Sequence, residues 1–211
     1  MTTFLSIFPL DLVVFPGEQL NLHIFEPRYM EMIRECIDTK KQFGIPPVLG
    51  GTMSELGTSM DIVEIARTYD NGEMDIRTRG VDVFRVLEVV REIPGKLYSG
   101  AIVHYPDNEK KTSSERMAAL ITTEVKRLYE LLNVSEKFPQ GKTAMLSYEI
   151  GHYVGFSKEQ EYEMLGLFSE LQRLEYIRRH LNEIVPVIHE LEEMKKRIKM
   201  NGHFRNISSD F

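Results

Sequence analysis

The chain has 211 residues, of which 42% are hydrophobic and 27% are charged, enough for one large domain or two small ones with an apolar core. This composition excludes a disordered tail and a miniature scaffold. Lysine and arginine number 26 against 32 aspartates and glutamates, so the formal net charge is −6. Because this balance provides no basic footprint for a phosphate backbone, we do not expect nucleic acid as a partner.

A single cysteine, Cys36, excludes an internal disulfide and a thiolate metal cluster, and it is ordinary in a reducing compartment. The N-terminal stretch 1–10 lacks the basic start of a secretion signal, and Pro9 and Asp11 interrupt its apolar run. No later stretch approaches the roughly 18 uninterrupted apolar residues of a membrane span. We therefore predict a cytoplasmic protein with no membrane partner.

The first half of the chain has the pattern of short strands separated by turns. The clearest turn is Asp70-Asn71-Gly72, because Asn-Gly tolerates the positive φ of a tight hairpin. Gly80 is expected to lead from one strand into the next, and Pro94-Gly95 is expected to form a further turn. The expected strands are 62–69, 74–79, 81–90 and 97–105. Successive strands of this kind indicate a barrel or a strongly curled sheet.

One helix interrupts the strands early, over residues 27–39. It begins with proline, which suits the first helical position because its missing N–H would have had no intrahelical partner there. Met30, Ile33 and Ile37 then recur at helical spacing on one face. We expect Cys36, beside that face, to be a small apolar filler rather than a nucleophile.

The polar segment 107–114 is predicted to join two unlike halves, because the hydrophobic period changes there from two to 3.6. Capping boxes are expected at three helix starts, formed by Thr112 with Glu115, Ser157 with Gln160 and Ser169 with Gln172. The predicted domains are a β-rich subdomain over 1–106, a helical subdomain over 112–200 and a tail over 201–211.

The last predicted helix carries apolar residues three and four positions apart, namely Leu174, Ile177, Leu181, Ile184, Ile188, Leu191 and Ile198. Pro186 is expected to kink or split this helix, and Asn201-Gly202 to end it. Because Pro186 and Lys195 interrupt the stripe, we expect it to pack within its own chain. The protein is then a monomer or a weak dimer.

The sequence contains fragments of catalytic motifs but none that is complete. Gly141-Lys142-Thr143 matches the end of a phosphate-binding P-loop, yet Glu136 stands where its first glycine should be. Glu149 and His152 have the spacing of a di-iron site, which needs a second copy that the sequence lacks. We therefore predict no catalytic residue, no metal site and no cofactor.

Three specific motifs follow one another near the N-terminus. They are Phe8-Pro9-Leu10, Val13-Val14-Phe15-Pro16-Gly17 and Phe25-Glu26-Pro27-Arg28-Tyr29. In this order, they closely resemble the opening of the Lon protease substrate-binding domain, also called the Lon N-terminal domain. The likeness continues through the predicted hairpins to Tyr105 and extends more loosely over the helices to about Lys199.

The resemblance implies an α+β fold: a PUA-like β pseudobarrel with one early helix, then a C-terminal helical bundle ending in a long helix. It also implies a non-catalytic module that binds exposed or unfolded polypeptide segments, for example for a protease or chaperone machine. The ATPase and serine-lysine peptidase modules of the full protease have no counterpart in the sequence, so we expect a free-standing form. The alternatives are a protein interaction scaffold or adaptor and, disfavoured by the net charge, PUA-like RNA binding.

We expect the polypeptide-binding surface where the second strand meets the first helix. Its predicted members are Phe15, Pro16, Phe25, Glu26, Pro27, Arg28 and Tyr29. Core packing is the alternative for both phenylalanines. Arg28 and Tyr29 can reach the carbonyls and aromatic side chains of a peptide, whereas the alternative for Arg28 is a local ion pair with Glu26 or Glu31.

Overall fold

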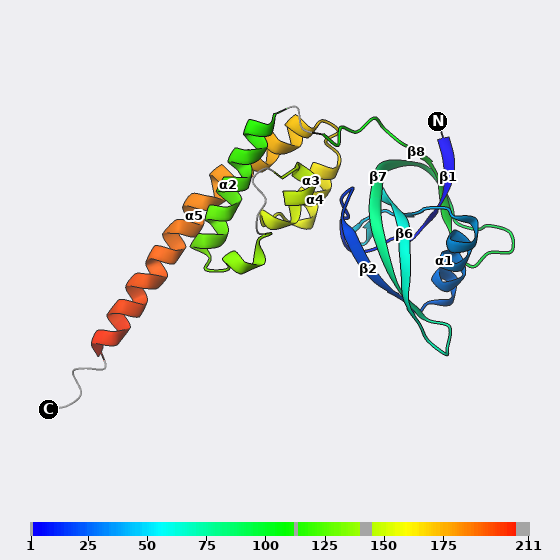
Figure 1. Cartoon of the computed structure of the whole chain (residues 1–211), viewed down its shortest axis with the longest axis horizontal. Helices are drawn as coiled ribbons and strands as arrows, with labels where there is room; N and C mark the ends of the chain where they lie inside the picture. The colour runs from blue at the N-terminus through cyan, green and yellow to red at the C-terminus, as the bar shows by residue number, and fades with distance from the viewer. Residues whose placement is uncertain (1, 112–113, 140–144, 206–211) are drawn as a thin grey trace. The chain divides into compact units, whose positions relative to one another are not determined.

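The computed structural model describes residues 2–111, 114–139 and 145–205 and divides the chain into two compact units. The first, here the barrel unit, comprises Met1–Lys111 and Gly155–Glu170. The second, here the helical unit, comprises Thr112–Val154 and Leu171–Phe211. Figure 1 shows strands in the first and helices in the second. The predicted α+β class, with strands preceding helices, is confirmed.

Six strands of the described chain form one sheet, in the order β2-β7-β6-β3-β1-β8. They are β1 (Thr2–Ile7), β2 (Gln19–Ile24), β3 (Phe43–Ile45), β6 (Leu56–Thr68), β7 (Met74–Val90) and β8 (Gly100–His104). A further pairing of β7 with β8 closes a ring of five strands, β7, β6, β3, β1 and β8. Strand β2 stays outside this ring and pairs with residues 74–79 of β7. Two short strands, β4 (Val48–Leu49) and β5 (Thr52–Met53), pair with each other outside this sheet. The arrangement is the predicted pseudobarrel (Figure 1).

Strand β7 changes partner halfway along one edge. Residues 74–79 pair with β2, and residues 85–90 pair with β8. The change occurs at Gly80, whose N–H donates to the Glu18 carbonyl and whose carbonyl accepts from Gly17 N–H, both at 2.8 Å. The prediction of two strands separated at Gly80 is therefore wrong. Both halves belong to one strand because β6 pairs with β7 on both sides of this point.

The β6–β7 turn forms at the predicted Asp70-Asn71-Gly72, although Asn71 does not adopt a positive φ. Gly72 has a φ of +86°, in the left-handed region that favours glycine. The Asn71 side chain accepts a hydrogen bond from Glu73 N–H at 3.2 Å. Strand β6 begins at Leu56, earlier than predicted, and its register with β7 shifts at three bulges. These shifts increase the twist that curls a sheet into a barrel.

The predicted helix over 27–39 is confirmed as α1 (Pro27–Thr39). It ends at Lys40, which adopts left-handed backbone angles, while Lys41 N–H donates to the Cys36 carbonyl at 3.0 Å. Its inner face contributes Met32, Ile33 and Cys36 to the main core of the barrel unit. Cys36 is thus the buried filler expected from the sequence, and burial raises the pKa of its thiol to about 11.

The other helices of the described chain are α2 (Glu115–Leu131), α3 (Ser147–Ile150), α4 (Lys158–Leu165), α5 (Glu170–Arg205) and the short 3-10 helices η1 (Ser135–Lys137) and η2 (Gly151–Tyr153). Of these, α4 belongs to the barrel unit. Its predicted capping box of Ser157 with Gln160 is confirmed. Helix α2 is capped by Ser114, whereas the predicted cap residue Thr112 lies outside the described residues.

Helix α5 differs from its prediction at three places. Its start is capped by the Glu109 carboxylate, which accepts from Glu170 N–H at 3.1 Å and from the Ser169 hydroxyl at 2.9 Å in place of the predicted Ser169 box. The split, one of the two outcomes predicted at Pro186, does not occur, because a proline removes one donor and leaves the flanking turns bonded. The kink stays a prediction. It also continues through Gly202 to Arg205, since glycine permits a left-handed helix end without imposing one.

The helical unit buries the first part of the α5 stripe. Its buried apolar residues include Ala118, Ile121, Val125 and Leu128 of α2 and Leu174, Ile177 and Leu181 of α5. Arg173 is also fully buried, with its guanidinium 4.1 Å from the centre of the Tyr148 ring. Leu191 and Ile198, farther along the stripe, are 50% and 64% exposed. The stripe is therefore a core face only up to about Leu181.

Candidate polypeptide-binding surface

The seven residues predicted for the binding surface differ in exposure. Phe15 is 0% exposed and Tyr29 is also buried. Pro16 and Glu26 are half-buried, whereas Pro27 and Arg28 are exposed. Phe25 is 58% exposed, which is unusual for so large an apolar side chain. The part of the set that a partner can touch therefore lies between the end of β2 and the first turn of α1.

Phe15 belongs to the core because of the loop that carries it. Its N–H donates to the Glu18 carboxylate at 2.8 Å, and the neighbouring Val14 carbonyl accepts from the buried Thr58 hydroxyl at 2.5 Å. A Cβ added at Gly80 would lie 2.4 Å from the Phe15 carbonyl oxygen. The loop is thus pressed against β7, with the Phe15 ring inside the barrel unit. Core packing, the alternative considered for this residue, is what the structure shows.

Tyr29 packs inward and Arg28 lies over it. The Tyr29 ring is 3.9 Å from that of Phe8 between centroids, and burial raises the pKa of its hydroxyl. The Arg28 guanidinium is 4.5 Å from the Tyr29 ring centre and forms an ion pair with Glu26, with Nη2 and Oε2 2.7 Å apart. The local ion-pair alternative for Arg28 is therefore confirmed with Glu26. Glu31 instead accepts a hydrogen bond from Leu97 N–H.

Phe25 stands beside an aromatic and charged cluster that was not expected from the sequence. His23 stacks near its ring, with centroids 5.9 Å apart, and contacts Tyr69 edge to face at 5.7 Å. The Arg67 guanidinium lies over Tyr69 at 4.4 Å. We call the exposed atoms of Phe25, Arg28, His23 and Tyr69 the Phe25 surface. Its signal in the sequence is weak, because it depends on the register of β2 against β7, which sets His23 opposite Asp75.

Asp75 holds this cluster together. Its carboxylate bonds His23 Nδ1 at 2.7 Å and accepts from the Tyr69 hydroxyl at 2.8 Å. The bond from His23, and then that from Tyr69, lowers the pKa of Asp75, while the same carboxylate raises the pKa of Tyr69. His23 Nε2 faces Glu73 at 3.4 Å. The shared carboxylate therefore orients both the His23 ring and the Tyr69 ring.

The other motif fragments take structural roles or lie outside the described residues. Glu149 accepts a hydrogen bond from Leu146 N–H at the start of α3. Gly141-Lys142-Thr143 lies outside the described residues. Over the described ranges, no group of three or more histidine, cysteine, aspartate or glutamate side chains is placed to hold a metal ion. None of the described helices combines the length and apolar character needed to cross a membrane.

Comparison with known proteins identifies the family. The model of the ATP-dependent protease La (LON) substrate-binding domain matches residues 5–183, which is most of the chain. The chain belongs to this family. The resemblance seen in the motifs of residues 8–29 is thereby confirmed, and the Lon-type domain supplies the context for the surface described above: a substrate-recognition module.

Two solved structures show the same Lon-type fold. A Lon N-terminal domain protein from Xanthomonas campestris has a TM-score of 0.65 at 24% identity, over 84% of this chain and 98% of that one. The N-terminal domain of Mycobacterium avium complex Lon protease has a TM-score of 0.61 at 13% identity, over 85% of this chain and 98% of that one. At these identities the comparison establishes the fold, strands followed by a long helix.

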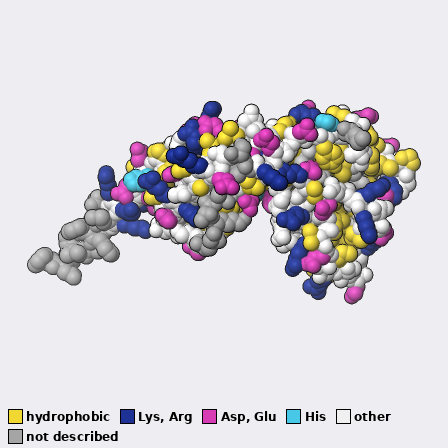
Figure 2. All heavy atoms as spheres, turned by 45° about the horizontal axis from the view of Figure 1, so that its top comes forward, with side chains coloured by type: hydrophobic (Ala, Val, Ile, Leu, Met, Phe, Trp, Pro, Cys, Tyr) yellow, Lys and Arg dark blue, Asp and Glu magenta, His cyan; other side chains and the backbone are white. Residues whose placement is uncertain are grey.

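The surface drawn in Figure 2 has a mixed character. Basic and acidic side chains are interspersed on this face, and hydrophobic side chains gather on the barrel unit. Mixed charges around apolar groups are typical of protein recognition, whereas phosphate backbones require a continuous basic stripe.

Proposed function

We propose that this Lon-type domain binds exposed or unfolded polypeptide segments through the Phe25 surface, without catalysing a reaction on them. Membership of the family supports a role in substrate recognition. The exposed aromatic surface supports unfolded segments as the kind of substrate. A bound client is then available to a separate protease or chaperone machine.

The observation that carries this proposal is the exposure of Phe25 next to bonded aromatic neighbours. An unfolded segment displays apolar side chains that a folded protein hides, and an exposed ring held beside His23 offers them a contact with little loss of entropy. The Arg28–Glu26 pair follows Phe25 closely in the sequence and presents charges of both signs. Such a pair tolerates varied polar residues around an apolar anchor, as binding of many clients requires.

A second candidate function, an adaptor that binds a partner helix, is favoured by the far part of α5. Val187, Leu191, Met194 and Ile198 are all exposed and recur at spacings of four and three residues. An amphipathic partner helix docks on a stripe of this kind. Loss of a captured partner in Leu191→Asp, with polypeptide binding unchanged, is the result that would favour this candidate.

The test is the affinity for an unfolded probe, reduced and carboxymethylated lactalbumin, with the disulfide-intact folded form for comparison. Phe25→Ser is expected to weaken binding of the unfolded probe about tenfold, because it removes one half-exposed aromatic contact. Leu87→Ser is the matched control, since Leu87 is exposed to a similar extent, 54%, on β7. Equal affinities of wild type and Phe25→Ser would move the site elsewhere, and no binding by wild type would refute the proposed function.

A further inference from the structure

Strand β1 has one edge that is only partly paired. On one side it pairs with β8 over Thr2–Ser6, but on the other side it pairs with β3 only at Ser6 and Ile7. Residues 2–5 therefore have no strand partner on the β3 side within the described chain. At about 3.3 Å per residue, this edge is about 13 Å long.

The main-chain groups of Phe4 point to that unpaired edge. Peptide groups alternate in direction along a strand, and Ile7 N–H donates to the Ser99 carbonyl beside β8 at 3.1 Å. Phe8 N–H instead donates to the Gly44 carbonyl on the β3 side at 2.7 Å. The even-numbered residues of β1 therefore face the β3 side. Phe4 offers there one donor and one acceptor of the kind that an added strand satisfies.

The chain that would otherwise fill this position is held away from β1. The left-handed Lys40 at the end of α1 turns the backbone aside before β3 begins. The Cys36 thiol donates to the Gln42 carbonyl, with Sγ and O 3.9 Å apart, and the Gln42 side chain donates to Asp61 at 2.9 Å. These contacts hold residues 40–42 against α1 and β6, and no strand pairing joins them to β1 among the described residues. The gap is therefore built into the fold.

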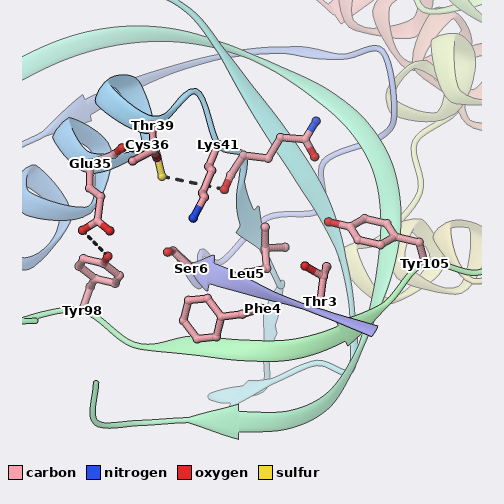
Figure 3. A pocket seen from close by; sticks show the side chains of 11 residues that line it. Thr3, Phe4, Leu5, Ser6, Glu35, Cys36, Thr39, Lys41, Tyr98 and Tyr105 are labelled. Atoms are coloured by element: carbon pink, nitrogen blue, oxygen red, sulfur yellow. Dashed lines mark hydrogen bonds between the residues drawn. The ribbon is translucent and has the colours of Figure 1, made fainter. Parts of the chain in front are cut away.

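A groove of about 400 Å³ occupies the gap. Its walls come from β1 (Thr3–Ser6), the end of α1 and the segment before β3, with Tyr98 and Tyr105 also lining it. Figure 3 shows Lys41 across the groove from the β1 side chains. The Phe4 ring is 46% exposed and lies against Gly100, where an added Cβ would be 2.2 Å from it. The groove thus combines an open strand edge with an exposed aromatic ring.

The charge of the groove indicates what kind of segment fits. Glu35 is already paired with Lys96, and the Tyr98 hydroxyl donates to the same carboxylate at 2.7 Å. Lys41 is exposed and forms no ion pair among the described residues. Beside the hydrogen bonds from Lys96 and Tyr98, its charge also helps to lower the pKa of Glu35, which lines the same groove. The groove thus presents an exposed ammonium group that has no salt bridge among the described residues, and an acidic side chain complements it.

We propose that the free edge of β1 takes up an extended, acidic segment of a bound polypeptide as an added β-strand. This site rests on the proposed function, because both take an unfolded polypeptide. It lies by the last turns of α1, whereas the Phe25 surface lies at the first turn. The 13-residue helix is about 20 Å long at 1.5 Å per residue, so one extended chain of about six residues spans the distance between its ends.

The test uses an eight-residue peptide of alternating valine and threonine with one central glutamate. Two further peptides carry lysine in place of glutamate, or N-methyl groups on alternate amides so that one edge cannot donate hydrogen bonds. The full chain is expected to bind the glutamate peptide about tenfold more tightly than the N-methylated one. Lys41→Glu is expected to weaken binding of the glutamate peptide about fivefold and to favour the lysine peptide. Arg116→Glu, an equal charge change in the helical unit, serves as its control.

A matched pair of variants separates the main chain from the side chain. Phe4→Pro removes the outward N–H while leaving the bonds to β8, and Phe4→Val keeps that N–H; both remove the ring from Gly100. Peptide binding is expected to fall about tenfold in Phe4→Pro relative to Phe4→Val. Equal binding by the two folded variants would overturn the proposal. If Phe4→Pro does not fold, two other comparisons test the proposal. Wild type that binds the N-methylated peptide as tightly as the glutamate peptide, or a folded Lys41→Glu variant that binds the glutamate peptide as tightly as wild type does, would overturn it.

The outcomes for the two sites are distinct. Loss of lactalbumin binding in Phe25→Ser, with glutamate-peptide binding equal in Phe4→Pro and Phe4→Val, would leave the proposed function and refute the β1 site. Absence of lactalbumin binding in wild type would refute the proposed function itself. Sedimentation that shows a dimer broken by Phe4→Pro, together with no binding of the glutamate peptide, would assign the edge to a second copy of this chain and overturn the proposal.

Discussion

Phe15 and Phe25 show how position within a fold separates two similar residues. Phe15 precedes Pro16 before β2 begins, and Phe25 precedes Glu26 after β2 ends. Both side chains have the apolar character of core residues. Phe15 lies in the loop that crosses Gly80 and is fully buried, whereas Phe25 follows the last residue of β2 and is largely exposed. The first therefore stabilises the barrel unit, and the second is available to a partner.

Gly80 is the residue whose replacement is expected to affect the barrel unit most directly. An added Cβ would lie 2.4 Å from the Phe15 carbonyl oxygen and 3.2 Å from a methyl carbon of Thr58, and both main-chain groups of Gly80 are bonded to the same loop. Gly80→Ala should lower the free energy of unfolding by about 2–4 kcal/mol in urea titration. Gly95→Ala, with a φ of +73° but no atom within 4 Å of the added Cβ, should cost only about 1 kcal/mol. Equal effects would show that the loop moves aside.

Glu35 provides a test of the groove by pH. Hydrogen bonds from Lys96 and then Tyr98 lower the pKa of Glu35 below its usual value of 4.5. A carboxyl with a lowered folded-state pKa stabilises the protein above its unfolded pKa, and this contribution is lost as pH falls through the folded value. The urea midpoint of Glu35→Gln should therefore lie below that of wild type at pH 7, and the difference should be smaller at an acidic pH below 4.5. Glu92→Gln, at an exposed position, is the control, and a constant difference at both pH values would contradict the assignment.

At the scale of elements, β7 is the strand around which the barrel unit is organised. It pairs with β6 along one edge and with β2 and then β8 along the other, so that one strand contacts three. In the register of β2 against β7, Gln19 pairs with Arg79 beside the change of partner, and Ile24 pairs with Met74 at the start of β7. The position of Phe25, which follows Ile24, is thus set by the pairing of β2 with the first half of β7.

The segment 107–114 is predicted to be cut first in limited proteolysis. Lys110 and Lys111 offer trypsin two sites between β8 and α2. Glu109 N–H bonds the Phe168 carbonyl at 2.8 Å, and Lys110 forms an ion pair with Asp82, so we expect the early cut after Lys111 rather than nearer β8. Mass spectrometry of the early fragments tests this expectation. Cleavage inside β6 or β7 before this segment would show that the domain boundary is misplaced.

At the scale of the whole molecule, the two units offer different kinds of surface. The barrel unit carries an exposed aromatic group and an open strand edge, whereas α5 in the helical unit carries an exposed apolar stripe from Val187 to Ile198. The first kind suits an extended chain and the second a partner helix. We therefore propose the barrel unit as the place of polypeptide recognition.

The protein is predicted to be mainly monomeric, or a weak dimer, at low micromolar concentration. Pro186 stands immediately before the exposed part of the α5 stripe and Lys195 lies within it, and both oppose the long continuous seam of a stable coiled coil. Sedimentation velocity over a concentration series measures this. A tight dimer that Ile188→Asp converts into a folded monomer would contradict the prediction and strengthen the adaptor candidate.

The sequence by itself determined those features that depend on short-range chemistry. The Asn-Gly turn, the proline start and amphipathic face of α1, and the Ser157 capping box all involve residues within a few positions of one another. Their conformations are dictated by local backbone and side-chain preferences. The motifs over 8–29 likewise identified the family and with it the α+β fold.

The tertiary structure alone decided which of these residues are accessible and what they face. The pairing of His23 with Asp75 needs the register of strands 52 positions apart, the continuity of β7 needs β6 beside it, and the exposure of Phe25 needs β2 to end where it does. The free edge of β1 exists because the α1 cap holds residues 40–42 elsewhere. Burial and register are set by contacts between distant segments, and a pattern read along one segment does not contain them.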